Sequence, residues 1–205
     1  MTLYPAMLKL AGRRVVVVGA GPVAMRKVEA MVRAGARVRL VAPVIPAADG
    51  MVGVDCIAAE YDRRQLDGAA LVFACTNDPE LNRRIAQDAR ELRIFVNAAD
   101  QPAECDFFAA STVADGDVVV AVSTGGNAPG LAKRIAKQLS SAMPPRVGEF
   151  ADLLGKCRAV VRTTVSDTHR RGKILNELAS DATYRLFIQR GPEAVRTRLS
   201  DMLKE

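Results

Sequence analysis

Short apolar runs alternate with amphipathic segments over the first hundred residues. The pattern predicts a strand over residues 13–18 and a helix over residues 25–34 that Gly35 closes. It continues with predicted strands over residues 37–42, 52–58, 69–75 and 93–97 and a helix over residues 80–91. Strand and helix alternating at this spacing indicate right-handed βαβ units. We therefore expect an α/β fold with a Rossmann-type doubly wound parallel sheet.

The alternation of predicted strands and helices ends after Asp100. Two extended segments, residues 106–111 and 117–123, flank a Gly-Asp turn and predict a hairpin or an antiparallel edge. A helix is expected over residues 130–142, where two prolines stop it. From residue 147 onward the pattern is helical, with breaks near Gly172 and at Gly191.

These patterns divide the chain into three predicted parts. Residues 1–112 form the Rossmann domain, residues 113–146 a linking or oligomerising part, and residues 147–205 a C-terminal helical domain.

Composition supports a folded protein that does not enter a membrane. Of 205 residues, 49% are hydrophobic, which is enough for a buried core. No apolar run approaches the roughly 18 to 20 residues of a membrane helix. The first residues show no basic start followed by an apolar stretch, so no signal peptide is predicted and we expect a cytoplasmic location.

Cysteine and histidine are too sparse for an obvious metal site. The four cysteines form no CxxC pair and His169 is the only histidine, so we expect neither structural zinc nor a disulfide framework. Cys56 and Cys75 lie in apolar stretches and are expected to be buried as small hydrophobic residues. His169 lies in a basic helical stretch and is expected on the surface.

The net charge of +6 is concentrated near the C-terminus. Residues 145–205 hold 12 Lys/Arg and 8 Asp/Glu, which leaves +4 there. Such a tail can attract a polyanion, or it can be a solvated helix surface. The chain has six Phe, three Tyr and no Trp, which leaves few side chains for stacking on nucleic-acid bases, so no nucleic-acid partner is predicted.

A dinucleotide fingerprint follows the first strand. Gly19-x-Gly21-x-x-Ala24 allows a tight turn, backbone approach to a pyrophosphate, and close packing of helix on strand. The alternative is a purely structural turn. The acidic residue that usually ends the second strand is missing, and Arg37 and Arg39 could either meet a 2′-phosphate or be solvated. NAD and NADP both remain open on these residues.

Polar residues follow three further strands. Thr76-Asn77-Asp78 could line a cofactor cleft, or Asn77 or Asp78 could cap a helix that begins at Pro79. Asp100 could be a general base, bind a metal or form a turn. The segment 123–129 can form an anion-binding nest or a simple glycine turn with a helix cap.

These motifs together resemble one family. Gly19-Ala-Gly-Pro-Val-Ala-Met-Arg-Lys27 looks like the glycine turn and Val-Ala-x-Arg-Lys of precorrin-2 dehydrogenases, which also form the N-terminal module of siroheme synthase. The likeness continues, in order, through Ala34-Gly35-Ala36, Thr76-Asn77-Asp78, Asn97-Ala-Ala-Asp100, Phe107 and Val122-Ser123-Thr124-Gly125-Gly126.

The resemblance implies NAD-dependent oxidation of precorrin-2, a tetrapyrrole, to sirohydrochlorin by a homodimer. Some members also insert ferrous iron into the product. Asp100 matches the family aspartate implicated in dehydrogenation, and Ser123 matches a serine phosphorylated in some relatives. The chain departs from the family pattern at two positions, where Ala110 stands in place of a Pro and Ala128 in place of a Ser.

Pattern and resemblance together give the expected site. Asp100 is the predicted catalytic residue. The predicted cofactor-binding residues are Gly19, Gly21, Pro22, Val23, Ala24, Pro43, Val44, Thr76 and Asn77. The predicted substrate-binding residues are Asn97, Ser123, Gly125 and Gly126, and no metal ligand is predicted.

Two other function classes compete with this one. A non-catalytic NAD-binding sensor module would share the glycine turn but would not require Asp100 or the Ser123–Gly126 segment. A dehydrogenase of small acids would normally use a catalytic His or Lys near a second domain.

Overall fold

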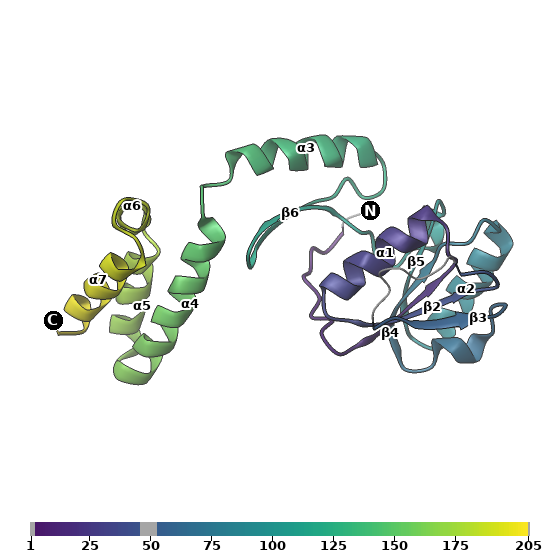
Figure 1. Cartoon of the computed structure of the whole chain (residues 1–205), viewed down its shortest axis with the longest axis horizontal. Helices are drawn as coiled ribbons and strands as arrows, with labels where there is room; N and C mark the ends of the chain where they lie inside the picture. Colours follow the sequence, from purple (N-terminus) through teal and green to yellow (C-terminus); the bar gives the residue numbers. More distant parts are fainter. Residues whose placement is uncertain (1–2, 46–52, 205) are drawn as a thin grey trace. The chain divides into compact units, whose positions relative to one another are not determined.

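The computed structural model describes residues 3–45 and 53–204, and its contacts divide the chain into two compact units, Met1–Ala109 and Ala110–Glu205 (Figure 1). The expected domain boundary after residue 112 lies close to this division. The expected boundary after residue 146 falls inside the second unit.

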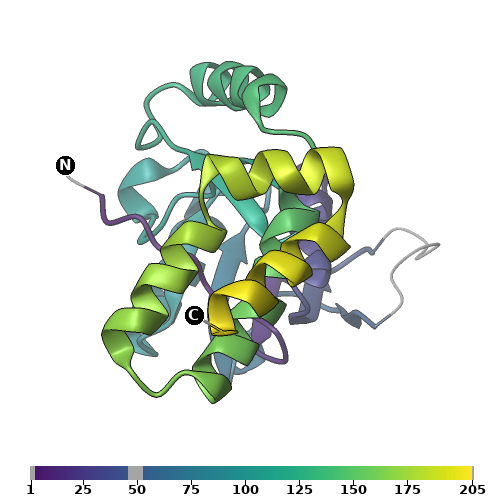
Figure 2. The same cartoon turned by 90° about the vertical axis from the view of Figure 1, so that its left-hand side faces the viewer.

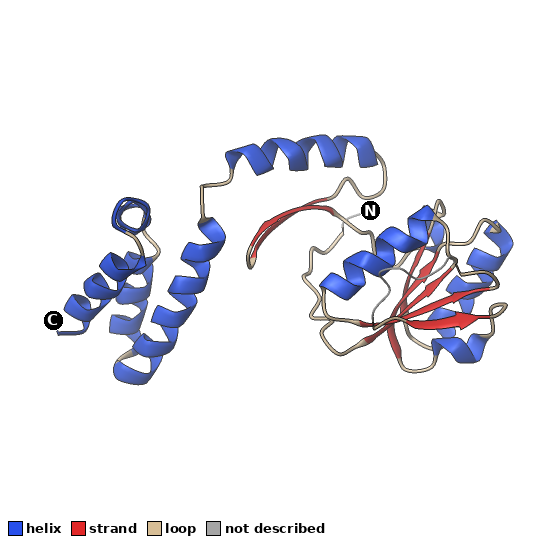
Figure 3. Cartoon of the chain, in the orientation of Figure 1, coloured by secondary structure: helices blue, strands red, loops and turns tan. Residues whose placement is uncertain are grey.

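The first unit is built on a five-stranded parallel sheet. The strands are β1 (Arg14–Val18), β2 (Arg37–Ala42), β3 (Asp55–Ala58), β4 (Ala69–Ala74) and β5 (Phe95–Ala98). Their order is β3-β2-β1-β4-β5, so the direction of winding reverses between β1 and β4. Helices α1 (Pro22–Arg33) and α2 (Pro79–Glu91) cover opposite faces of the sheet (Figure 3). The predicted Rossmann-type α/β fold is confirmed.

Burial explains why these segments form strands. Val15–Val18 is at most 2% exposed, as expected for a central parallel strand that is covered on both faces. Single-turn helices η1 (Arg63–Leu66) and η2 (Pro102–Glu104) lie in the connections. Helix α1 begins at Pro22, earlier than predicted, because proline suits the first helical position. Part of the predicted strand 52–58 lies outside the described residues.

The second unit contains a hairpin and helices. Strands β6 (Ser111–Asp115) and β7 (Val118–Val122) pair antiparallel, and α3 (Pro129–Ala142) packs against them. Four helices follow: α4 (Val147–Thr164), α5 (Thr168–Leu178), α6 (Asp181–Arg190) and α7 (Pro192–Lys204). These four helices, drawn in green to yellow in Figure 2, enclose a core. The core includes Phe150, Val161, Leu178 and Phe187. None of the helices in the described ranges is both long and apolar enough to cross a membrane.

Two element predictions are wrong. The extended segment expected over residues 106–111 is not a strand, since the hairpin begins only at Ser111. Asp106 instead bonds to Val96, with its N–H 2.8 Å from the carbonyl oxygen, and Phe107 packs edge-to-face on Phe73. The break expected near Gly172 is also wrong, because α5 runs through that residue.

Capping residues set the actual helix starts. The Asp167 carboxylate accepts the Arg170 N–H and begins α5, and the Ser180 hydroxyl accepts the Thr183 N–H and begins α6. The predicted break at Gly191 is confirmed and has a positive φ of 78°.

The two cysteine predictions had different outcomes. Cys75 is buried as expected. Cys56 is exposed, so its predicted burial is wrong, because β3 is an edge strand of the sheet. His169 is exposed on α5, as expected.

Candidate functional site

The parallel strands have their carboxyl ends at one edge of the sheet (Figure 3). Most of the predicted site residues of the first unit lie at these strand ends. Gly19 and Gly21 follow β1, Pro43 and Val44 follow β2, Thr76 and Asn77 follow β4, and Asn97 and Asp100 end or follow β5. Ligands of open α/β sheets bind at this edge, where the winding reverses. Ser123, Gly125 and Gly126 belong to the second unit.

Gly19 is required by the fold itself. Its φ is +109°, and a Cβ there would lie 2.3 Å from the carbonyl oxygen of Cys75. Its N–H donates to the Val41 carbonyl at 2.8 Å. Gly19 therefore lets the ends of β1 and β4 come together.

Gly21 has no such requirement. Its backbone is extended, and a Cβ built on it meets nothing within 4 Å. It is the N-cap of α1 without a side-chain cap, and the first turn has no acidic residue. The first helical bond runs from the Met25 N–H to the Gly21 carbonyl, so the N–H of the exposed residue Val23 remains at the helix end as a donor. This open, positively polarised end fits a phosphate group.

Apolar side chains border this helix end. Val23 is 38% exposed and Val44 is 80% exposed, while Pro43 is also exposed. Ala24 is fully buried against the sheet, which lets α1 pack closely on β1. The exposed apolar groups offer surface to the body of a nucleotide.

Structural bonds occupy most of the segment after β4. The Asp78 carboxylate accepts the N–H groups of Glu80 and Leu81 and caps α2. The Thr76 hydroxyl lies 2.8 Å from Oδ1 of Asn82, a buried residue that also accepts the Thr76 N–H. Helix capping by Asp78 is confirmed, and only Asn77 is exposed with its side chain available. The pattern gave no sign of Asn82 beyond its spacing of one helical turn from Asp78.

Asp100 is exposed after β5 and has left-handed backbone geometry, with φ at +57°. Asn97, by contrast, is tied into the fold, since its Nδ2 donates to the Phe107 carbonyl at 2.9 Å. A left-handed aspartate is tolerated because its short side chain suits that region. Asp100 thus presents its carboxylate at the edge of the sheet. The Asn97 amide nitrogen instead fixes the position of the segment around Phe107.

Cys105 fixes the loop that carries Asp100. Its Sγ lies 3.3 Å from the Ala98 N–H, 3.2 Å from the Ala98 carbonyl and 3.4 Å from the Gln101 carbonyl. Burial raises the pKa of this thiol, which keeps its proton available to donate. Gln101 adds a bond from Nε2 to the Pro79 carbonyl at 2.9 Å. The sequence did not predict a role for Cys105 or Gln101, because their hydrogen bonds form only when the loop is folded.

A lysine lies on the inner face of α1 near the same edge. The Lys27 Nζ is 5.3 Å from the centroid of the Phe73 ring, and burial lowers the pKa of Lys27. Burial also raises the pKa of the Cys75 thiol to about 11, and the nearby charges of Lys27 and Asp100 act on it in opposite directions. In the sequence, Lys27 stands out only as the last residue of the Val-Ala-x-Arg-Lys motif.

The two arginines considered for a 2′-phosphate are engaged elsewhere. The Arg39 Nε donates to the Asp55 carboxylate at 2.8 Å, and its Nη1 donates to the Gln65 carbonyl. The Arg37 Nε donates to the Gly12 carbonyl at 2.8 Å. These bonds tie β2 to neighbouring segments, so both residues have a structural role.

In the second unit, the segment before α3 forms a local turn. The Ser123 hydroxyl accepts the Gly125 N–H at 3.2 Å, and the Thr124 hydroxyl accepts the Ala128 N–H at 3.1 Å. Gly125 and Gly126 have φ values of 63° and 86°. The segment therefore forms a glycine turn held by hydroxyl hydrogen bonds, and no side chain caps the start of α3.

Acidic side chains within residues 145–205 partly neutralise the positive charge of this segment. Ion pairs join Arg146 to Glu149, Lys156 to Asp152, Arg196 to Glu193, Arg198 to Glu177, and Lys204 to Asp201. Arg170 donates to the last carbonyls of α7.

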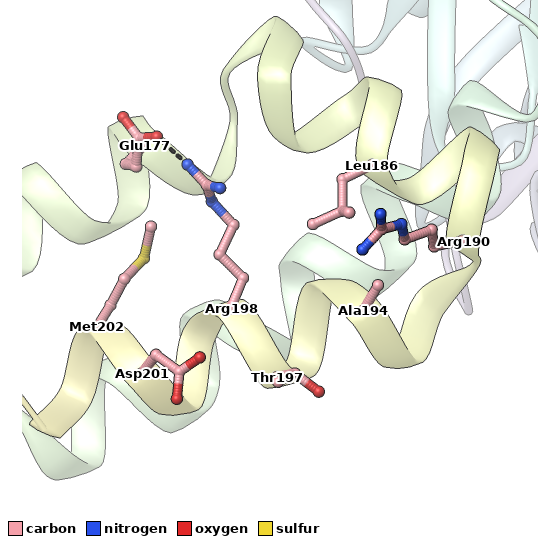
Figure 4. A pocket seen from close by; sticks show the side chains of 8 residues that line it. All are labelled: Glu177, Leu186, Arg190, Ala194, Thr197, Arg198, Asp201 and Met202. Carbon is pink, nitrogen blue, oxygen red and sulfur yellow. Dashed lines mark hydrogen bonds and ion pairs between the residues drawn. The ribbon is translucent and has the colours of Figure 1, made fainter.

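Helices α5, α6 and α7 surround a cavity of about 550 Å³ (Figure 4). Arg198 extends from α7 to Glu177 on α5, while Arg190 comes from α6 and Asp201 from α7. Two basic and two acidic side chains line it, so its charge is balanced and it offers no net attraction for an anion. Across residues 3–45 and 53–204, no three His, Cys, Asp or Glu side chains are grouped so that they could hold a metal ion.

A family model described as putative NAD(P)-binding matches residues 6–111, which is just over half of the chain. The chain belongs to this NAD(P)-binding family. The matched segment contains the glycine turn, the β4 and β5 ends and Asp100.

Relatives of this NAD(P)-binding chain extend the likeness beyond the Rossmann unit. A siroheme synthase of Thioalkalivibrio sulfidiphilus is 32% identical over all of this chain and 42% of its own length. One of Azotobacter vinelandii is 38% identical over 83% of this chain and 38% of its own length. The chain thus spans about two-fifths of the length of these relatives.

A solved structure described as SirC, precorrin-2 dehydrogenase, covers 97% of this chain and 100% of its own, with a TM-score of 0.77 and 25% identity. These relatives confirm the resemblance to precorrin-2 dehydrogenases and siroheme synthases that the motifs indicated.

Proposed function

We propose that this protein is an NAD-dependent precorrin-2 dehydrogenase that forms sirohydrochlorin on the route to sirohaem. The observation that carries the proposal is the uncapped start of α1 at Gly21, which lies at the same edge of the sheet as the Asp100 carboxylate. Relatives named siroheme synthase and a structure named precorrin-2 dehydrogenase support the choice of substrate.

The residues of the first unit fit a dinucleotide. The open space at Gly21 and the first-turn N–H groups would receive its pyrophosphate, and Val23 and Val44 would contact its apolar parts. When bound, the cofactor supplies the hydride acceptor for the oxidation. Because Arg37 and Arg39 are engaged in structural bonds, we favour NAD over NADP.

Asp100 would take the proton that balances the reaction. Oxidation of precorrin-2 releases a hydride and a proton, and an exposed carboxylate at the edge of the sheet can accept that proton. The loop bonds of Cys105 hold the Asp100 backbone in place while this happens. Asn77 remains a proposed contact of the cofactor. The proposed contacts of the substrate remain Asn97, Ser123, Gly125 and Gly126.

The decisive test is anaerobic incubation of the purified protein with precorrin-2 and NAD, followed by absorption spectroscopy. We expect sirohydrochlorin to form with one NADH per turnover. The proposed location of this biosynthetic enzyme is the cytoplasm. NAD binding without turnover would instead support the sensor module. Later addition of ferrous iron tests chelation, since sirohaem formation faster than in a protein-free control would show it.

We also propose a homodimer that forms through the hairpin and α3. A two-stranded sheet is marginally stable by itself, and β6 and β7 contain no fully buried residue. Val119, Leu131 and Leu139 are large exposed apolar residues of this region. A second copy would cover them and could add strands to the hairpin.

Charges placed on this surface are expected to separate the protomers. The double variant Leu131→Lys, Leu139→Lys should raise the dimer dissociation constant by about a hundredfold or more, because lysines would replace buried apolar contacts. Light scattering after gel filtration measures the change. Val160→Lys on α4, which is also exposed, serves as the control and should leave the mass unchanged. A wild-type protein that is monomeric at micromolar concentration would contradict the proposal.

A further inference from the structure

A half-buried ammonium group near the proposed reaction site has no anionic partner. Lys27 lies between the buried residues Ala24 and Val28 on the inner face of α1, over the ring of Phe73. Within the described part of the chain, no carboxylate forms an ion pair or hydrogen bond with its Nζ. Burying an unpaired charge opposes folding, so stability does not explain a lysine at this position.

The groups around Lys27 do not supply the missing negative charge. The face of Phe73 attracts the ammonium, but less strongly than a paired anion does in a partly buried site. Cys75 is close enough to interact electrostatically, but burial raises its pKa to about 11 and the thiol is neutral near pH 7. The position therefore favours an anion that arrives with a ligand.

Lys27 and Asp100 both lie near Cys75, the residue that follows β4. Both charges act on the Cys75 thiol, with opposite sign, so both lie within electrostatic reach of one point at the edge of the sheet. A substrate whose proton reaches Asp100 would pass close to the Lys27 ammonium. A tetrapyrrole with many carboxylates can present one to Lys27 while its ring system faces Asp100.

We propose that Lys27 binds a carboxylate of the tetrapyrrole substrate and so orients the ring for oxidation. The inference rests on the proposed function for the identity of the substrate. It adds a substrate-binding residue in the Rossmann unit, within electrostatic reach of the same thiol as Asp100.

The test compares three variants by fluorescence titration with uroporphyrin III, an octacarboxylate tetrapyrrole that needs no turnover. Lys27→Met keeps the length and the apolar stem but removes the charge, and it should weaken binding about tenfold or more. Lys27→Arg keeps the charge and should stay within about threefold of wild type. Arg26→Met removes a charge from the exposed neighbouring residue and should also stay within threefold.

Further measurements separate this role from others. The melting temperature of Lys27→Met should be unchanged or higher, because an unpaired half-buried charge is lost. With precorrin-2, Lys27→Met should raise KM more than it lowers kcat, and NAD affinity by calorimetry should be unchanged.

Two results would overturn the assignment. One is uroporphyrin binding by Lys27→Met equal to wild type. The other is a loss of NAD affinity with tetrapyrrole binding intact, which would show that the anion is the pyrophosphate. A wild-type protein that does not oxidise precorrin-2 would reject the proposed function, while the uroporphyrin titration would still decide the role of Lys27.

Discussion

Replacement of Asp100 by asparagine is expected to lower the turnover of precorrin-2 by roughly a hundredfold or more, the usual scale for removing a general base. Asparagine keeps the size of the side chain and tolerates the left-handed backbone at φ +57°, so the loop should keep its shape. The measurement is the rate of sirohydrochlorin formation at saturating NAD, with tetrapyrrole binding measured separately.

Two further variants separate chemistry from backbone strain. Asp100→Ala should lose as much turnover as Asp100→Asn and also destabilise the loop by about 1 kcal/mol, since alanine is disfavoured in the left-handed region. Asp100→Gly removes that strain and should lose turnover without losing stability. Near wild-type turnover in all three would leave Asp100 as a turn residue. Weakened binding with normal turnover per bound complex would make it a substrate anchor.

Gly21→Asp is expected to abolish NAD binding while the fold stays intact. A Cβ at this position meets nothing within 4 Å, and an aspartate at the N-cap would itself accept first-turn N–H groups. Its carboxylate would therefore occupy the donors that a pyrophosphate needs and would repel the phosphates. Calorimetry should show at least about a hundredfold loss of affinity, with an unchanged or higher melting temperature.

Two controls make this result specific. Ala128→Asp places the same charge at the uncapped start of α3 and should leave NAD affinity unchanged. Gly19→Ala should lower the melting temperature instead, because its Cβ would lie 2.3 Å from the Cys75 carbonyl oxygen. If Gly21→Asp bound NAD with wild-type affinity, the cofactor would have to lie elsewhere.

The first unit was largely predictable because its signals are local. A valine run, a glycine turn and an amphipathic helix each depend on neighbouring residues, and together they predicted the order of the βαβ units. The capping role of Asp78 was likewise visible in its position before Pro79. One error arose where a distant contact decides the conformation, since Phe107 packs on Phe73 rather than extending the hairpin. The other concerned Gly172, which lies inside helix α5 because the Asp167 cap sets the start of that helix.

The site divides in the same way. By itself, the sequence determined the glycine turn, the strand ends that carry polar residues and the family resemblance, since these depend on the order of residues along the chain. Only the tertiary structure decided that Gly19 is needed for the fold while Gly21 is open, that Cys105 fixes the Asp100 loop, and that Lys27 lies half-buried without an anion. These facts depend on which atoms of distant strands, helices and loops come within a few ångströms of one another, and packing sets those distances.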